Sequence, residues 1–139
     1  MSAQPAGYSR TPLARKLGVK PEARLALIGA PDGFDDTLGA LPPGVAVRRS
    51  LRGGFDLAVA FFVARRPLQR RLPGLKAALD PAGGLWVAWP KRASGVDTDL
   101  TETVVRELGL AAGLVDNKVC AIDQVWSGLR FVYRLADRP

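Results

Sequence analysis

Short apolar runs alternate with segments of helical periodicity along most of the chain. The apolar runs are bounded by Gly and Pro, which is typical of strands buried on both faces of a sheet. The pattern predicts strands within residues 24–31, 44–50, 55–64 and 83–90, and helices within residues 34–42, 66–80 and 97–113. The last apolar stretch, residues 114–135, contains no helical pattern and is interpreted as two extended segments joined through DQVWSG.

A short helix is expected in an N-terminal arm, residues 1–22. Thr11 is a suitable N-cap, Pro12 suits the first helical position, and Gly18 can end the helix. We expect this arm to pack on a single α/β domain that spans residues 23–139.

Strands that alternate with helices predict a three-layer α/β protein with a mostly parallel sheet, because parallel neighbours need a crossover connection. The two final strands have no helix between them, so they are expected to pair as an antiparallel hairpin at one edge. In the helix within residues 66–80, Pro73 is expected to mark a kink or a restart. The order of elements therefore predicts a Rossmann-like sheet with a C-terminal hairpin.

The composition fits one domain with its own core, since the chain has 139 residues of which 47% are hydrophobic. Its single cysteine cannot form an internal disulfide. No apolar run approaches the ~18 residues of a membrane span, and the N-terminal residues lack the apolar core of a signal peptide. We expect a cytoplasmic protein without a membrane partner.

Arginine supplies most of the positive charge, and the formal net charge is +7. Three arginine pairs lie close together in the sequence: Arg48 with Arg49, Arg65 with Arg66, and Arg70 with Arg71. Such pairs could neutralise nucleic-acid phosphates, or they could serve only solubility. No zinc-finger spacing or aromatic RNA-binding motif supports the first interpretation over the second.

Several catalytic chemistries lack their residues. The chain contains no histidine, which removes the commonest general base and metal ligand. With one cysteine and scattered carboxylates, no metal-site spacing can be written. Cys120 lies in a predicted strand and is interpreted as a buried thiol rather than a nucleophile.

The stretch WPKRASGVDTDLTE, residues 89–102, directly follows a predicted strand. Ligand crevices of open α/β sheets lie beyond the carboxyl ends of the strands, and the amino end of a helix attracts anions. The next helix is expected to begin near Asp97 or Thr98. We predict a phosphate or carboxylate site built from this helix terminus and from five loop residues: Lys91, Arg92, Ser94, Gly95 and Thr98. The alternative is a capped connection whose basic pair is solvated.

A second candidate surface lies in the stretch DQVWSGLRF. Trp126 is expected in the hairpin turn, where an exposed indole beside Ser127 and Arg130 could stack on a planar ligand or anchor a protein partner. The alternative is a tryptophan that folds over the sheet as part of the core. The sequence does not show whether this turn lies near Lys91.

The order of predicted elements resembles a truncated class I methyltransferase. The stretch LKAALDPAGGLWVAW is similar to the leucine-rich helix, glycine-rich turn and apolar strand of that superfamily, and the closing hairpin is similar too. The resemblance implies S-adenosylmethionine as a cofactor. It further implies that a glycine-rich loop after the first strand and an acidic residue near the end of the second would hold it.

This chain departs from that pattern at both places. Its first loop is IGAPDGFDD, with Gly29 but no G-x-G-x-G motif, and its second strand ends with Arg48 and Arg49. Three carboxylates of the first loop could replace the missing ribose partner, or could serve only in a turn and a helix N-cap: Asp32, Asp35 and Asp36.

Two further stretches, W-P-K-x-x-S-G-V and V-C-A-I-D-x-x-W-S-G-L, are similar to those of an uncharacterised family of small bacterial proteins. The similarity covers nearly the whole chain and implies no reaction, because that family has no assigned one. It highlights seven positions without giving them roles: Lys91, Ser94, Gly95, Asp99, Asp123, Trp126 and Ser127.

These observations predict a non-catalytic module that binds a small anionic ligand or a protein partner. One alternative is an S-adenosylmethionine-dependent methyltransferase with unusual cofactor contacts. Another is a nucleic-acid accessory protein that uses the arginine pairs. An exposed edge strand would also allow a homodimer.

Overall fold

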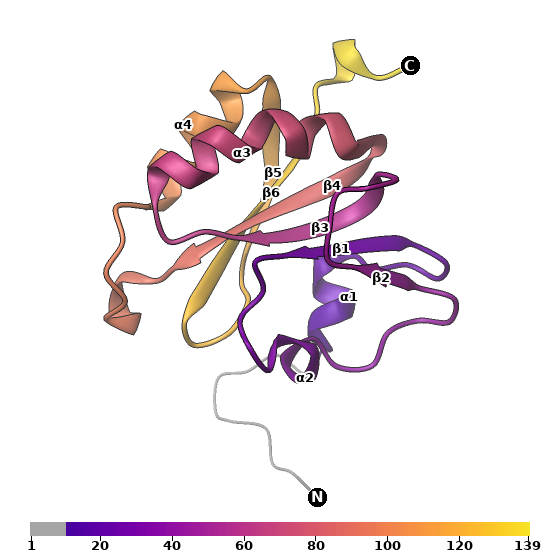
Figure 1. Cartoon of the computed structure of the whole chain (residues 1–139), viewed down its shortest axis with the longest axis horizontal. Coiled ribbons are helices and arrows are strands. Elements are labelled where there is room, and N and C mark those ends of the chain that lie inside the picture. Colours follow the sequence, from indigo (N-terminus) through magenta and orange to yellow (C-terminus); the bar gives the residue numbers. More distant parts are fainter. Residues whose placement is uncertain (1–10) are drawn as a thin grey trace, which may run out of the picture.

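Six strands form one sheet in the order β2-β1-β3-β4-β6-β5 (Figure 1). The structure is a computed structural model and describes residues 11–139. The strands are β1 (Arg24–Ile28), β2 (Ala46–Arg48), β3 (Phe55–Phe61), β4 (Leu79–Pro90), β5 (Leu114–Ala121) and β6 (Trp126–Tyr133). β1 to β4 are parallel, whereas β6 pairs antiparallel with both β4 and β5. The predicted mostly parallel sheet with a C-terminal antiparallel hairpin is confirmed.

Helices cover both faces of the sheet and complete the three predicted layers (Figure 1). They are α1 (Leu13–Leu17), α2 (Phe34–Leu38), α3 (Arg65–Ala78) and α4 (Glu102–Ala111), with short 3-10 helices η1 (Arg92–Ser94) and η2 (Leu135–Asp137). α1 and α2 pack on one face, and α3 and α4 pack on the other. Within residues 11–139, no helix has the length and apolar character needed to cross a membrane.

A buried tryptophan fixes α1 to the sheet. Trp86 of β4 donates a hydrogen bond of 2.8 Å from its indole nitrogen to the carbonyl oxygen of Leu17. Gly18 then ends the helix with a φ of 89°, as predicted. Pro12 occupies the N-cap position instead of the first helical position. The remaining part of the expected arm, residues 1–10, lies outside the described residues.

α3 continues through Pro73 without an interruption, so the expected restart is wrong. Leu72 and Leu75, on either side of the proline, are almost completely buried against the sheet. A proline removes one backbone hydrogen bond from a helix. The packing of these two leucines holds the helix on the sheet despite that loss.

The predicted glycine-rich turn before β4 lies inside the strand as a bulge. β4 pairs with β3 through Phe55 and Leu79, and then through Leu57 and Gly84. The four intervening residues, 80–83, therefore oppose a single residue of β3. The strand is longer at its amino end than the sequence pattern predicted.

Candidate functional site

Four parallel strands end at one edge of the sheet, here called the carboxyl rim. The strand order reverses between β1 and β3, and open α/β sheets place ligand crevices at such a switch point. Three aromatic rings occupy this place on the α1 and α2 face. Phe34 and Phe61 meet edge to face at 4.8 Å between ring centroids, and Phe61 meets Trp126 at 5.0 Å. The switch point is therefore packed as core on this face.

Gly29 follows β1 and has a φ of 68°, which favours glycine. A Cβ atom placed there would lie 3.1 Å from the carbonyl oxygen of Phe61. The close approach of β3 accounts for this glycine without a ligand. Gly29 lines neither of the two hollows of the carboxyl rim described next.

Asp32 lies in a hollow of about 310 Å³ between the β1–α2 loop and the end of β2, here called the β1 hollow. Asp35, Asp36 and Arg49 line it as well. Arg49 donates hydrogen bonds of 3.0 and 2.7 Å to the two carboxylate oxygens of Asp35. The resemblance requires an acidic residue at the end of β2, where this chain has Arg49. The charge of Arg49 is neutralised by Asp35, one of the three candidate carboxylates.

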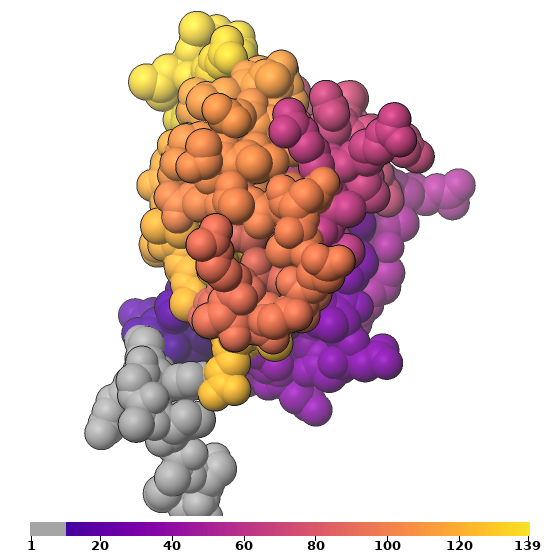
Figure 2. All heavy atoms as spheres, turned by 90° about the vertical axis from the view of Figure 1, so that its left-hand side faces the viewer, coloured from indigo at the N-terminus to yellow at the C-terminus, as the bar shows by residue number. Residues whose placement is uncertain are grey.

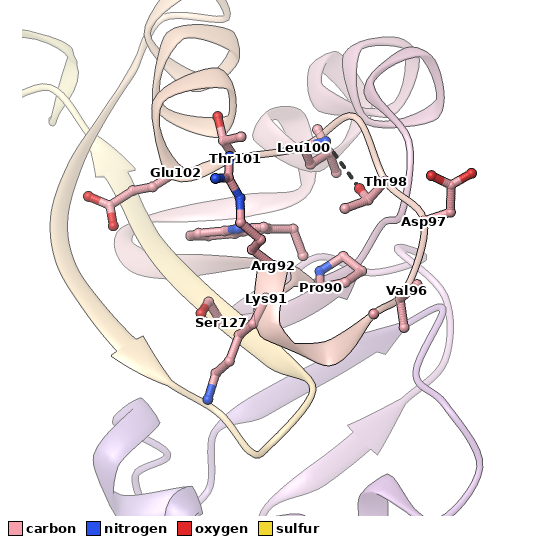
Figure 3. A pocket seen from close by; sticks show the side chains of 12 residues that line it. Pro90, Lys91, Arg92, Val96, Asp97, Thr98, Leu100, Thr101, Glu102 and Ser127 are labelled. Carbon is pink, nitrogen blue, oxygen red and sulfur yellow. Dashed lines mark hydrogen bonds between the residues drawn. The ribbon is translucent and has the colours of Figure 1, made fainter.

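A larger hollow of about 600 Å³, here called the rim cavity, lies beyond the end of β4 (Figure 3). Its charged lining residues are Lys91, Arg92, Asp97 and Glu102. Its hydroxyl groups belong to Thr98, Thr101 and Ser127, and its remaining lining comes from Trp89, Pro90, Gly95, Val96 and Leu100. The structure brings four of the five loop residues predicted for the anion site together here: Lys91, Arg92, Gly95 and Thr98.

Ser94 belongs to the same loop but does not line the cavity. Its hydroxyl donates a hydrogen bond of 2.6 Å to the carbonyl oxygen of Lys91 and accepts one of 3.2 Å from the backbone nitrogen of Val96. Gly95 adopts a φ of 76° directly after η1 and allows the chain to turn. Ser94 therefore shapes the loop, and its contact with a ligand stays a prediction.

α4 begins later than predicted, because the polar residues before it form hydrogen bonds with the loop between β3 and α3. Thr98 donates a hydrogen bond of 2.6 Å to the carbonyl oxygen of Val63, which follows β3. Asp99 accepts one of 2.7 Å from the backbone nitrogen of Arg65, the first residue of α3. The loop after β4 is thus fastened to the loop after β3.

The cap of α4 is Thr101, whose hydroxyl accepts a hydrogen bond of 3.2 Å from the backbone nitrogen of Val104. Neither Asp97 nor Asp99 caps this helix, which begins at Glu102 and not near Asp97 or Thr98 as expected. The positive end of the α4 dipole lies beside the rim cavity, with the Thr101 hydroxyl as its cap and the Glu102 carboxylate in its first turn.

Lys91 and Arg92 point in different directions (Figure 3). The guanidinium of Arg92 extends toward Thr101 at the start of α4, whereas the Lys91 amine points away from it. Within residues 11–139, neither forms an ion pair, while Glu102 is paired with Arg106 at 2.8 Å. The two cations do not form the single anion clamp that their adjacency suggested.

The hairpin turn and the Lys91 loop meet. The backbone nitrogen of Lys91 donates a hydrogen bond of 2.7 Å to the carbonyl oxygen of Val125. In the β4–β6 ladder, Trp89 is paired with Ser127, and Ser127 lines the rim cavity. This proximity was left open by the sequence, and it adds Ser127 to the ligand-site candidates.

Trp126 belongs to β6 and packs with the aromatic rings on the α1 and α2 face, opposite the rim cavity. The alternative of a tryptophan folded over the sheet is the one that the structure supports. Arg130 lies apart from that indole, over Gly84, and reaches Asn117 at 3.4 Å. Burial, together with the nearby Arg138, lowers the pKa of Arg130. Trp126, Ser127 and Arg130 therefore do not form one surface.

Other titratable groups also have shifted pKa values, among them Cys120 and Asp56. Burial raises the pKa of the Cys120 thiol, although Lys16, Lys118 and Lys91 oppose the shift. At the amino end of the parallel strands, hydrogen bonds from Arg24 lower the pKa of Asp56. Residues 11–139 contain no cluster of three or more His, Cys, Asp or Glu side chains that could hold a metal ion.

Solved structures of methyltransferases match most of the chain. One is an S-adenosylmethionine-dependent methyltransferase from Aquifex aeolicus, at 15% identity and a TM-score of 0.60, covering 84% of this chain and 85% of that one. The 1,6-didemethyltoxoflavin methyltransferase of Burkholderia thailandensis, with S-adenosylhomocysteine bound, has 15% identity and a TM-score of 0.60 over 86% and 76% of the two chains. Magnesium protoporphyrin IX methyltransferase of Synechocystis has 10% identity and a TM-score of 0.59 over 88% and 74%.

The chain has the class I methyltransferase fold. Identities this low show the fold alone, and a pericyclic reaction enzyme matches with a TM-score of 0.60 at 13% identity. No family model and no curated protein matches the chain. The similarity to the uncharacterised bacterial family thus rests on its two quoted stretches and stays a prediction.

The β1 and β2 ends do not fit S-adenosylmethionine in the manner that the resemblance implied. Gly29 is closed off by β3, and Arg49 stands at the end of β2 in place of an acid. The rim cavity offers a different set of groups that fits the cofactor's chemistry, with cations, carboxylates, hydroxyls and apolar surface together. Sequence reasoning missed Asp97 and Glu102 as lining residues because both have the pattern of helix caps.

Proposed function

We propose that this chain binds a small zwitterionic ligand in the rim cavity, and that this ligand is S-adenosylmethionine. The observation that carries the proposal is the mixed charge of the lining. Lys91 and Arg92 could bind an anionic group, while Asp97 and Glu102 would repel a ligand that is purely anionic. A ligand with both charges would satisfy Arg92 and Asp97, neither of which forms an ion pair within residues 11–139.

The anionic end of such a ligand would lie beside Arg92. This guanidinium extends toward the start of α4, where backbone N–H groups and the helix dipole also favour negative charge. An arginine can bind a carboxylate through two parallel hydrogen bonds. The amino-acid carboxylate of S-adenosylmethionine is a group of this kind.

The cationic and hydroxyl-bearing parts of the ligand would lie beside the carboxylates. Asp97 is exposed and forms no ion pair within residues 11–139, so its carboxylate can accept hydrogen bonds from an ammonium or from ribose hydroxyls. Val96, Pro90 and Leu100 supply the apolar surface that a nucleobase requires. When bound, the cofactor would supply an activated methyl group.

The three similar solved structures described above favour S-adenosylmethionine among zwitterionic ligands, because all three are methyltransferases. They also favour methyl transfer over a module without catalysis. The chain's departure from the usual glycine and acid positions requires the cofactor contacts to lie at β4 instead. This is the unusual arrangement that the sequence left as an alternative.

Calorimetric titration with S-adenosylmethionine and S-adenosylhomocysteine tests the proposal. We expect both to bind, and we expect Arg92→Ala to weaken binding about tenfold or more through the loss of a charge-assisted hydrogen bond. Arg52→Ala removes the same charge from an exposed loop elsewhere and should leave binding unchanged. No heat with either compound at millimolar concentration would refute the proposal.

The second candidate function is a site for a simple anion. One substitution distinguishes it from the zwitterion site, because the two sites predict different changes in ligand affinity. Removing the carboxylate in Asp97→Ala should weaken a zwitterionic ligand and strengthen inorganic phosphate. The measurement is the dissociation constant of each compound with the wild type and with the variant. Tighter binding of both compounds would support the anion site over the zwitterion site.

A further inference from the structure

The exposed side of α3 is strongly basic and contains no acid. Between Arg65 and Ala78 the helix has four arginines and one lysine, and no aspartate or glutamate. The arginines Arg65, Arg66, Arg70 and Arg71 are all exposed and are here called the arginine ridge. We propose that the arginine ridge binds the phosphodiester backbone of a nucleic acid.

None of the four guanidiniums is neutralised within residues 11–139. Arg24, Arg49 and Arg106 each form an ion pair with an aspartate or glutamate, whereas no ion pair involves the ridge. Residues 1–10 contain no acidic side chain. Figure 2 shows the α3 region in magenta, with side chains projecting beside α4 in orange. The ridge is therefore a concentrated positive surface open to a polyanion.

The spacing along the helix suits a row of phosphates. Arg66 and Arg70 are four residues apart, so they lie on the same side of α3 in successive turns. Together with Gln69 they line a shallow hollow of about 440 Å³ in which no acidic residue takes part. Guanidinium groups bind phosphate oxygens through paired hydrogen bonds, and the amide adds a further donor.

The chemistry of the ridge favours nucleic acid over a membrane surface. A helix that binds a bilayer buries an apolar face in it. The apolar residues of α3, Leu68, Leu72 and Leu75, are already buried on the sheet at 0 to 2% exposure. Within residues 11–139, no phenylalanine, tyrosine or tryptophan is fully exposed for stacking on bases. Binding should therefore depend on backbone charge and not on base sequence.

The ridge lies outside the rim cavity, and none of its side chains lines that cavity. This inference does not depend on the identity of the cavity's ligand. The protein could bind nucleic acid with or without S-adenosylmethionine, and the two properties can fail separately.

Fluorescence anisotropy with a labelled DNA duplex and with a single-stranded RNA tests the inference in the full chain. Four phosphate contacts on duplex DNA give a slope of about −3.6 for the logarithm of the binding constant against the logarithm of the salt concentration. The affinity should therefore fall roughly 150-fold between 50 and 200 mM salt. Arg66→Ala with Arg70→Ala removes two contacts, and its affinity should fall only about 12-fold over the same range. The two probes show which nucleic acid supplies the phosphates.

The matched control is Arg15→Ala with Lys20→Ala, which removes the same charge near α1 on the opposite side of the sheet. It should retain most of the wild-type slope. Arg66→Lys with Arg70→Lys keeps the charge and should retain binding if the alanine variant does not fold. The inference is overturned by no binding at 50 mM salt, by equal losses in both alanine variants, or by retention on phosphatidylserine vesicles without retention on nucleic acid.

Discussion

The carboxylate of Asp99 accepts a hydrogen bond of 2.7 Å from the backbone nitrogen of Arg65, which lies 34 positions earlier in the chain. The residue at the N-cap position of α3 is Ala64, which has no side chain that could cap the helix. Asp99 therefore supplies the missing cap from another loop. The same contact fixes the segment that forms one wall of the rim cavity.

Asp99→Ala should lower the free energy of unfolding by about 1 kcal/mol, the usual cost of losing an N-cap. The melting temperature should fall by about 4 °C. Asp97→Ala is the matched control, because Asp97 is an exposed carboxylate two residues away that caps no helix. Thermal unfolding by circular dichroism compares the two, and equal effects would argue against the capping role.

Two helical glycines should respond to alanine with opposite signs. Gly109 of α4 packs directly on the ring of Phe131, and a Cβ atom there would overlap that ring. Gly109→Ala should therefore destabilise the protein by roughly 1–3 kcal/mol through overpacking. Gly74 of α3 has Leu51 as its nearest neighbour at 3.8 Å, which is ordinary contact.

Gly74→Ala should stabilise the protein by up to about 1 kcal/mol, because alanine loses less backbone entropy in a helix. Urea unfolding of both variants measures whether each substitution raises or lowers the free energy of unfolding. Destabilisation by Gly74→Ala would mean that α3 is not a regular helix beyond Pro73.

Asp56 should contribute to acid sensitivity. Hydrogen bonds from Arg24 lower its pKa below the ordinary value, so protons bind more readily to the unfolded chain than to the native protein. Its stabilising contribution is present above the ordinary aspartate pKa and is lost as the pH falls through the native pKa. Asp56→Asn should therefore lower the urea midpoint at pH 7, and the difference from wild type should shrink toward pH 2. Asp36→Asn serves as a control for the loss of one exposed charge.

Cys120 should react slowly with alkylating reagents. Burial raises its pKa, and only the thiolate is the nucleophile. The pH midpoint of iodoacetamide labelling should lie above that of a free cysteine. Lys118→Ala should raise it further, since Lys118 lowers this pKa in the wild type. A midpoint below that of a free cysteine would contradict the buried environment.

The sheet could be predicted from the sequence because local pattern determines it. Each apolar run between glycine and proline became a strand, and the absence of a helix after residue 113 predicted the antiparallel hairpin of β5 and β6. The prediction of Gly18 as the end of α1 succeeded for the same reason, since a left-handed C-cap is a local feature.

The site was predicted only in part, because several of its side chains contact residues that are distant in the sequence. Asp99 has the sequence signature of a cap for α4, yet it caps α3. Gly29 has the signature of a cofactor loop, yet the approach of Phe61 explains it. Trp126 and Ser127 are neighbours in sequence, but the alternation of a strand sends them to opposite faces. Such assignments depend on tertiary contacts that one sequence does not reveal.

The most direct test of the central claim is to locate the ligand by the backbone amide chemical shifts of the ¹⁵N-labelled protein during titration with S-adenosylmethionine. We expect the largest changes in Lys91–Glu102 and at Ser127, around the rim cavity. Changes confined to Ala30–Asp36 and Arg49, around the β1 hollow, would contradict the account. So would unchanged shifts at millimolar ligand.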